Sequence, residues 1–469
     1  MARTSTKSSA LLLALLACSG DDSSDTPMTT DTTEETGDSG VGGVSEVVVS
    51  DVALEPLASM GTVIEATWTT DAAVPARVRF TVDGRTRETA TVEATAHRHL
   101  LVGVAPEAEV SVELVHDTAD GEQTQAESVT AGALPGAPAT TATGTSDRFL
   151  VLPLINEAAN QSSLAIIDPD GRVVWKVDDT SGLSVFRAHV ARDGSGVVYA
   201  ATLVDGGPNP DSKLVYVGWD GVVQREVPVP YLAHDFVELD DGSIVSLAYE
   251  FREDPTLGGV EGNRLVEVAP DGTVVGDVWS AWDCYDPNVN ESIDLEHGWI
   301  HANALDYDAT SGRFLVGMRN LTTIASVDIE TSSCAWGFGG NGGTVDITSS
   351  ESFLHQHQFE KTDGGMLVFD NSGAAGFESR VLEYSFDEGA GTASLERVIS
   401  TGEFTFILGD VHRLDGGDTL VTWSVPDLVQ RIDSDDNVVW SVTADDDDLI
   451  FGFTEVMEDP GRPDLGWMH

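Results

Sequence analysis

The sequence predicts an all-β protein: a six-bladed β-propeller preceded by a small fibronectin-III-like β-sandwich. Three observations support this prediction. The chain of 469 residues contains 47 glycines, many in the Asp-Gly and Gly-Gly pairs that form tight turns. Its segments alternate apolar and polar residues without a helical period. A strand–turn–strand unit also recurs after residue 147, at the spacing expected of propeller blades.

Composition restricts the class of partner. Hydrophobic residues make up 41% of the chain, enough for a substantial core. Asp and Glu number 79 against 24 Lys and Arg, so the net charge is −55. Such a charge argues against binding to nucleic acid or to an anionic membrane surface. We expect small-molecule partners and membrane contact only through a lipid anchor.

The N-terminus reads as an export signal over residues 1–17. Arg3 and Lys7 precede the apolar run "ALLLALLA", which is too short to span a bilayer and ends at Cys18. This pattern resembles a bacterial lipoprotein signal peptide, in which Cys18 is lipidated. The alternative is a plain secretory signal with an incidental cysteine. We therefore expect an exported protein, lipid-anchored at the outer membrane or cell envelope.

The next segments divide the chain. Residues 18–44 are acidic and almost without apolar side chains, which predicts a disordered tether. Residues 45–134 hold six or seven short alternating segments, such as "ARVRFTVDG" and "EVSVELVHD", and predict the sandwich. Residues 135–146, rich in Pro, Ala and Thr, predict a linker to the propeller at 147–469.

Two kinds of hairpin alternate along residues 147–469. The first has an Asp-Gly type turn and often ends in Trp, as in "LAIIDPDGRVVW"; its six turns fall near residues 170, 220, 271, 330, 388 and 436. The second opens with a histidine in five of its six copies, and a threonine holds the sixth position: His189, His234, His301, His357, His412 and Thr454. Because the innermost strands of a propeller line its channel, these positions predict a ring of imidazoles.

The predicted ring of five histidines has several possible roles. Neutral imidazole is a metal ligand, and "HQH" at 355–357 would place His355 and His357 on one face of a strand. Alternatively, the five histidines bind an anion. Arg319 ends the hairpin that His301 opens, and a guanidinium suits a tetrahedral oxyanion. A structural role is also open, chiefly for His189 and His412, as hydrogen bonds between blades.

Two cysteines lie outside the signal, Cys284 and Cys334. After export they would be able to form a disulfide, although two free buried thiols are the alternative.

One long stretch, "WIHANALDYDATSGRFLVGMRNLTTIASVDIETSSCAWGFGG", resembles the signature of the bacterial arylsulfate sulfotransferases. The matching positions are Trp299, His301, Asn303, Asp306, Arg319, Asp328, Trp336 and the pair Gly339–Gly340. The element "AHDF" at His234 and Asp235 also matches that family, as does "QHQF" at His357 with the "FDN" and "SRVLEY" elements that follow it.

The resemblance implies a transferase that moves a sulfuryl group from a phenolic sulfate ester to a phenolic acceptor, without a nucleotide donor, cofactor or metal. His357 would accept the sulfuryl group as a sulfohistidine, while His234, His301 and Arg319 would hold the sulfate oxygens. Asn303, His355 and His412 would contact the substrate. Two alternatives remain at this point: a non-enzymatic cell-surface binding propeller, and a metal-dependent hydrolase or lyase that uses the channel histidines.

Overall fold

The computed structural model describes residues 44–156, 158–202, 208–293, 297–347, 352–371, 378–446 and 448–462. The predicted signal peptide, Cys18 and nearly all of the predicted tether lie outside these residues. Within them, no helix has the length and apolar character needed to cross a bilayer. The described chain is built from strands, with two short 3-10 helices, η1 (Ala281–Asp283) and η2 (Arg319–Leu321).

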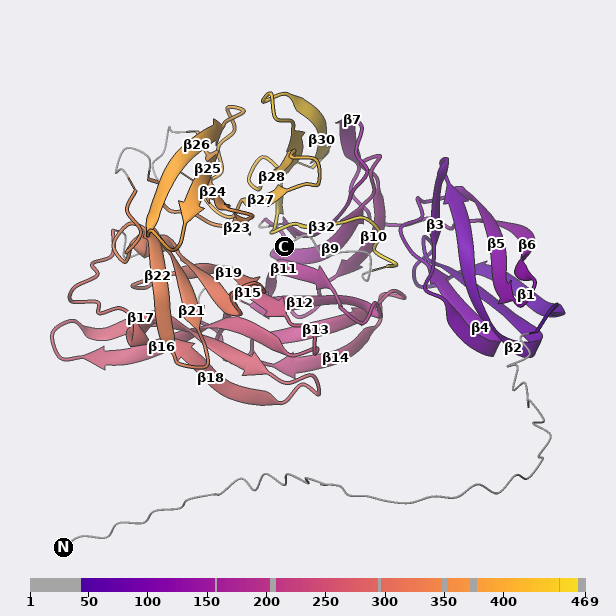
Figure 1. Cartoon of the computed structure of the whole chain (residues 1–469), viewed down its shortest axis with the longest axis horizontal. Coiled ribbons are helices and arrows are strands. Elements are labelled where there is room, and N and C mark those ends of the chain that lie inside the picture. The colour runs from indigo at the N-terminus through magenta and orange to yellow at the C-terminus, as the bar shows by residue number, and fades with distance from the viewer. Residues whose placement is uncertain are drawn as a thin grey trace, which may run out of the picture. The chain divides into compact units, whose positions relative to one another are not determined.

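The first six strands form one hydrogen-bonded sheet that folds around its own core (Figure 1). The long strand β2 pairs with β1 and β4 through its first half and with β3 and β5 through its second. Its side chains alternate between buried and half-buried, as the period-two pattern predicts, and they pack around Trp68 and Phe80. The bounds are β1 (Val49–Pro56), β2 (Ile64–Val82), β3 (Arg85–Glu88), β4 (Val92–Leu101), β5 (Glu109–Thr118) and β6 (Gly121–Thr130).

Six further antiparallel sheets follow in chain order and are arranged around a common centre (Figure 1). Four of them have four strands each, and this all-β arrangement is consistent with a β-propeller. Their strands are β8 (Phe149–Asn156), β9 (Gln161–Ile167), β10 (Val173–Asp178); β11 (Ser184–Val190), β12 (Gly196–Thr202), β13 (Lys213–Gly218), β14 (Val223–Pro228); β15 (Leu232–Glu238), β16 (Ile244–Asp254), β17 (Gly258–Val268), β18 (Val274–Ser280); β19 (Ala302–Asp308), β20 (Arg313–Met318), β21 (Thr323–Asp328), β22 (Ser333–Gly339); β23 (Phe359–Thr362), β24 (Gly365–Asp370), β25 (Arg380–Asp387), β26 (Thr392–Ile399); and β27 (Asp410–Arg413), β28 (Thr419–Trp423), β29 (Leu428–Ile432), β30 (Val438–Ala444).

The C-terminal strands close this series of sheets. Strands β31 (Leu449–Phe451) and β32 (Glu455–Met457) pair with β8, so the first sheet is completed by the end of the chain. The six predicted turns near residues 170 to 436 each join two neighbouring strands on the outer side of a sheet, for example β9 to β10 and β29 to β30. Closure therefore brings the inner strands of all six sheets to the same centre.

The linker prediction is wrong for residues 140–144. These residues form strand β7 (Thr140–Gly144), which pairs with β30 at the outer edge of the last sheet. The physical reason is that three of the five residues are threonine, whose β-branched side chain suits an edge strand as well as a linker. The strand also covers an otherwise unpaired edge.

Tryptophans at the ends of the hairpins pack between neighbouring sheets. Trp175 in β10, Trp279 in β18 and Trp440 in β30 are buried. The indole N–H of Trp175 donates to the carbonyl of Trp219 in the next sheet at 3.0 Å. These three tryptophans therefore anchor their hairpins in the core.

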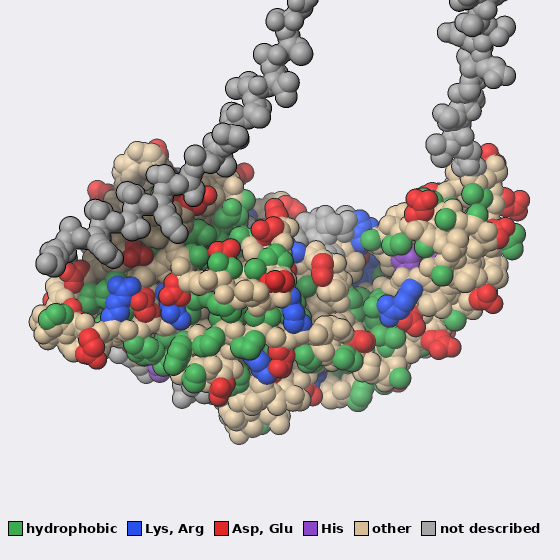
Figure 2. Space-filling view, turned by 90° about the horizontal axis from the view of Figure 1, so that it is seen from below, with side chains coloured by type: hydrophobic (Ala, Val, Ile, Leu, Met, Phe, Trp, Pro, Cys, Tyr) green, Lys and Arg blue, Asp and Glu red, His purple; other side chains and the backbone are tan. Residues whose placement is uncertain are grey.

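The surface carries the excess of acidic residues. Figure 2 shows Asp and Glu side chains spread over one face, with Lys and Arg among them. Many described arginines pair with carboxylates, such as Arg79 with Glu88 and Arg397 with Asp436. Exposed pairs of this kind contribute little stability. Because these arginines are already paired with carboxylates, few described cations remain to attract an anion. An arginine inside a functional site would therefore matter.

Candidate active site

A buried ion-pair network crosses the centre of the sheets. Arg187 in β11 donates from Nε to Asp235 Oδ1 in β15 at 2.9 Å and from Nη1 to Asp410 Oδ2 in β27 at 3.4 Å. Asp235 also accepts the backbone N–H of Leu305 at 2.9 Å, and Asp410 accepts that of Thr454 at 2.8 Å. The network therefore connects inner strands from several sheets, and it divides the predicted histidine ring into two groups.

The first group, which we call the histidine cluster, comprises His234, His301, His357 and Arg319. His234 immediately precedes Asp235, and the ring centroids of His234 and His301 lie 5.0 Å apart. His357 immediately precedes Gln358, whose amide donates to Asp235 Oδ2 at 2.8 Å. Asp235, which follows His234, thus binds the side chain of the residue that follows His357.

Arg319 is held against His301 by the backbone. Its N–H donates to the His301 carbonyl at 3.1 Å, and its guanidinium donates to Asn320 Oδ1 at 2.9 Å. The positive charge of Arg319 contributes to lowering the pKa of His234, His301 and His357. The guanidinium therefore lies within electrostatic reach of all three imidazoles, as an oxyanion site requires.

All three imidazoles of the cluster are neutral at physiological pH. Burial is the main cause: it lowers the pKa of His234 to about 4 and lowers the pKa of His301 and His357 well below the usual value for histidine. Neighbouring imidazoles add to the depression in each case. Neutral rings have a lone pair available, which a nucleophile needs.

The tautomer of His357 follows from its hydrogen bond. His357 Nδ1 lies 2.8 Å from Asn371 Oδ1. The orientation of the Asn371 amide is set by its Nδ2, which donates to the carbonyls of Thr405 at 2.8 Å and Leu408 at 2.9 Å. Asn371 Oδ1 must therefore accept a proton from Nδ1–H. In the neutral ring this leaves the lone pair on Nε2.

Buried polar atoms without partners mark the other side of the cluster. The Nδ1 atoms of His234 and His301 are buried and have no hydrogen-bond partner among the described residues. Asn303 donates from Nδ2 to the Gln356 carbonyl at 2.9 Å, while its Oδ1 also lacks a partner there. Since buried polar groups are normally hydrogen-bonded, unsatisfied ones point to a ligand.

The backbone at the cluster is held in an uncommon conformation. His301 and His355 have φ of 45° and 55°, in the left-handed region that side-chain-bearing residues seldom adopt. Such conformations concentrate at functional sites. His355 is not in a strand, because β23 begins at Phe359, so the prediction that His355 and His357 share a strand face is wrong. His355 still lies close enough to contribute to lowering the pKa of His357.

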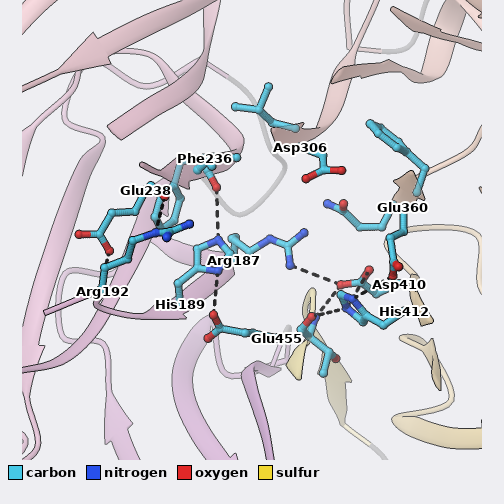
Figure 3. Close-up of a pocket in the computed structure, with 15 residues that line it drawn as sticks. Arg187, His189, Arg192, Phe236, Glu238, Asp306, Glu360, Asp410, His412 and Glu455 are labelled. Carbon is cyan, nitrogen blue, oxygen red and sulfur yellow. Dashed lines mark hydrogen bonds and ion pairs between the residues drawn. The ribbon is translucent and has the colours of Figure 1, made fainter. Parts of the chain in front are cut away.

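The second group, His189 and His412, lies in a separate cavity of about 70 Å³, which we call the acidic chamber (Figure 3). Five carboxylates line it, together with Arg187 and Arg192: Glu238, Asp306, Glu360, Asp410 and Glu455. Burial raises the pKa of Asp306 to about 6 and that of Glu360 to about 7. Burial opposes protonation of His412, but Asp410 beside it raises the pKa of His412 overall.

The prediction that five histidines occupy equivalent positions is therefore wrong, and the structure does not bring His412 to the cluster. His234 lies one residue before Asp235, whereas His412 lies two residues after Asp410. Because both aspartates bind Arg187, the two histidines are offset by three strand residues, about 10 Å. Instead, His412 Nε2 lies 2.7 Å from the carbonyl of Thr454 and His189 Nε2 lies 3.2 Å from that of Phe236. These hydrogen bonds between sheets are the structural role that the sequence analysis left open for His189 and His412.

Sequence reasoning missed three residues at the site: Arg187, Asn371 and His297. Arg187 carries no motif of its own, and Asn371 ends the "FDN" element without a role assigned to it, so only their contacts reveal what they do. His297 lies in the insertion that lengthens one repeat, and its ring centroid is 5.6 Å from that of His301. A histidine outside the repeat positions was the available signal.

The structure gives no support to a metal centre among the residues it describes, where no three His, Cys, Asp or Glu side chains converge as ligands. Cys284 and Cys334 are joined in a disulfide with a Cα–Cα distance of 5.9 Å. The bond ties the insertion after β18 to β22.

The site groups neutral imidazoles with a guanidinium, an arrangement whose chemistry suits an anionic substrate. The family model for arylsulfotransferase (ASST) matches residues 137–454. The chain belongs to this family and is an aryl-sulfate sulfotransferase, whose substrates are aryl sulfates and phenols. No curated protein matches the chain.

Several solved structures resemble the chain weakly. A protein of unknown function from Bacteroides caccae is 14% identical, with 66% of this chain and 98% of that one covered and a TM-score of 0.43. An inactive virginiamycin B lyase from Staphylococcus aureus, bound to quinupristin, is 10% identical, with coverages of 69% and 97% and a TM-score of 0.39. The periplasmic gluconolactonase of Pseudomonas aeruginosa is 12% identical, with coverages of 65% and 99% and a TM-score of 0.37. At these scores the likenesses carry no argument about function.

Proposed function

We propose that the protein transfers a sulfuryl group from a phenolic sulfate ester to a phenolic acceptor through a sulfohistidine at His357, without a nucleotide donor. The observation that carries this proposal is the hydrogen bond from His357 Nδ1 to Asn371 Oδ1 at 2.8 Å. It directs the lone pair of Nε2 into a cluster with an arginine and two further imidazoles.

In the first half-reaction, Nε2 of His357 attacks the sulfur of the aryl sulfate. The N–S bond forms, the S–O bond to the aryl group breaks, and the phenolic oxygen leaves with the bonding pair. Positive charge develops on the ring, and Asn371 Oδ1 stabilises it through Nδ1–H. Arg319 and the neutral imidazoles of His234 and His301 hold the sulfuryl oxygens, whose charge is the main thing to stabilise in transfers of this type.

In the second half-reaction, the oxygen of the acceptor phenol attacks the sulfur. The N–S bond breaks, its electron pair returns to Nε2, and the proton that the acceptor releases balances the one taken up by the departed phenolate. Because the first phenol leaves before the acceptor reacts with the sulfohistidine, ping-pong kinetics are expected. Asn303 supports the site through the Gln356 carbonyl, directly before His357.

The test uses the full chain with 4-nitrophenyl sulfate as donor and phenol as acceptor, in the absence of nucleotide. We expect acceptor-dependent release of nitrophenol, and a sulfuryl adduct on His357 by peptide mass spectrometry when acceptor is withheld. His357→Ala should abolish both. Turnover that persists in folded His357→Ala, or an adduct on another residue, would contradict the proposal.

We also propose that the fold is a six-bladed propeller and that the N-terminal sheet is a sandwich of fibronectin-III character. The six sheets and their closure by β31 and β32 on β8 support the first part. The core around Trp68 enclosed by β2, β4 and β5 supports the second. A crystal structure would test both, and a ring of a different number of blades would contradict the first.

We propose, finally, that the protein is exported and anchored by a lipid on Cys18 to the outer membrane or cell envelope. The support is the sequence pattern of residues 1–18. Metabolic labelling with a fatty acid should mark the wild type and not Cys18→Ser. Equal labelling of both, or none in either, would contradict the anchor.

A further inference from the structure

Phenolic oxygen must gain a proton when it leaves as phenol and lose one when it attacks as acceptor. The three imidazoles of the histidine cluster are poorly suited to supply or take this proton, because burial holds the pKa of His234 at about 4 and that of the other two well below the usual range. General acids and bases work best when their pKa lies near the operating pH. A further titratable group at the site, in contact with water, would meet this need.

His297 is such a group. Its side chain is exposed, unlike those of the cluster. Its ring lies edge-on to that of His301, with centroids 5.6 Å apart. Its charged form contributes to lowering the pKa of both His234 and His301, so it lies within electrostatic reach of the cluster. His297 therefore lies at the exposed edge of the histidine cluster.

The turn that carries His297 is held firmly in place. The Trp299 N–H donates to the Glu261 carbonyl at 2.8 Å, and the Gly298 carbonyl accepts from Asn320 Nδ2 at 2.9 Å. Gly298 has a φ of 97°, and a Cβ there would lie 2.8 Å from Glu261 Oε1, so the turn requires glycine. Asn320 is also the partner of Arg319, so the turn and the guanidinium share one support.

A carboxylate stands beside the imidazole. Burial raises the pKa of Glu261, and the nearby charge of His297 lowers it. Glu261 and His297 therefore lie within electrostatic reach of each other. Cys284 belongs to the same insertion, and its disulfide to Cys334 holds the other end of the insertion against the next sheet.

We propose that His297 is the general acid and base of the transfer reaction: it protonates the departing phenolic oxygen as the S–O bond breaks, and it removes the acceptor's proton as the new S–O bond forms. The proton lost to the first product is recovered from the second substrate, so the cycle balances. This inference rests on the proposed sulfohistidine mechanism and assigns the proton transfers within it.

The test measures the donor half-reaction in single turnovers without acceptor. Release of the phenol is monitored. Donors of decreasing leaving-group ability are compared: 4-nitrophenyl, phenyl and 4-methoxyphenyl sulfate. Nitrophenolate leaves readily without a proton, whereas the other two need one. For His297→Gln and His297→Ala we expect little change with 4-nitrophenyl sulfate and a loss of about 100-fold or more with the poorer leaving groups, as is usual for removal of a general acid.

Two controls sharpen the result. Val289→Ala removes an exposed apolar side chain of the same insertion and should leave all three donors unaffected. Because His297 is exposed, added imidazole should restore phenyl sulfate turnover to His297→Ala and not to His297→Gln, whose side chain fills the space. An equal loss for all donors, or no loss for any, would overturn the assignment to His297. Failure of the wild type with every donor would instead contradict the sulfohistidine mechanism.

Discussion

Removal of the Asn371 amide tests the most specific feature of the site. In Asn371→Ala, Nδ1–H of His357 loses its buried acceptor, and the ring is free to take the tautomer with the proton on Nε2. Leaving one partner of a buried hydrogen bond unsatisfied costs about 1–3 kcal/mol. At about 1.36 kcal/mol for each factor of ten, the rate of His357 sulfation should fall by about 5- to 150-fold. Because Asn371 is not expected to touch the sulfate, the loss should fall on kcat, with KM little changed.

The assay is the pre-steady-state burst of nitrophenol from 4-nitrophenyl sulfate, with thermal unfolding measured alongside. Ser379→Ala is a matched control, because Ser379 Oγ donates to the same Thr405 carbonyl at 3.0 Å as the Asn371 amide does. This variant loses two buried hydrogen bonds to Thr405 but keeps Asn371 Oδ1 as the acceptor for His357. A burst rate for Asn371→Ala within about twofold of the wild type would refute the tautomer argument. So would an equal loss in Ser379→Ala.

Four further outcomes are expected. Arg319→Gln should lower kcat/KM by about 100- to 1,000-fold, as removal of an oxyanion donor does, with Arg319→Lys intermediate; a loss under about tenfold would contradict its role. Because the pKa of His357 lies well below its usual value, the imidazole keeps its lone pair in weak acid. The burst rate with 4-nitrophenyl sulfate should therefore stay constant from about pH 8 to pH 6 and fall only below that. A decrease that begins at or above about pH 6.5 would argue against His357 as the nucleophile. In the N-terminal sheet, burial lowers the pKa of His99 to about 4, so the native state binds fewer protons than the unfolded state. The stability that this residue contributes is present above about pH 6.5 and falls as the pH decreases, by about 2 kcal/mol at pH 5. The free energy of unfolding, measured with denaturant, should therefore depend less on pH in His99→Gln than in the wild type. An identical pH dependence would count against the lowered pKa of His99. Finally, the bond between Cys284 and Cys334 spans 50 residues, so its reduction should lower the free energy of unfolding by up to about 4 kcal/mol, and an unchanged unfolding midpoint in reductant would contradict a structural role.

Much of the architecture could be predicted because it repeats. The Asp-Gly turns recur at the junction of the outer strands, where a left-handed glycine such as Gly171 or Gly272 is needed. The tryptophans that follow are buried between sheets. Strand β7 escaped prediction because five threonine-rich residues suit a linker and an edge strand equally, and only the partner β30 distinguishes the two.

The histidines show the limit of repeat counting. His234 and His412 hold the same position in the hairpin pattern, but a shift of three residues places His234 in the histidine cluster and His412 in the acidic chamber. Bulges such as that between Ala302 and Ala304 alter the register within a strand and are not visible in the pattern. The ion pairs of Arg187 with Asp235 and Asp410 reveal the correct level of each strand.

By itself, the sequence determined the all-β class, the spacing of the repeating hairpins and the core set of His234, His301, Arg319 and His357, because turn residues, strand alternation and a family motif are local properties of the chain. Only the tertiary structure decided which imidazoles meet, which nitrogen of His357 is free, and that His297 stands at the edge of the cluster. Those features depend on contacts between residues of different sheets, and such contacts exist only once the ring of sheets has closed.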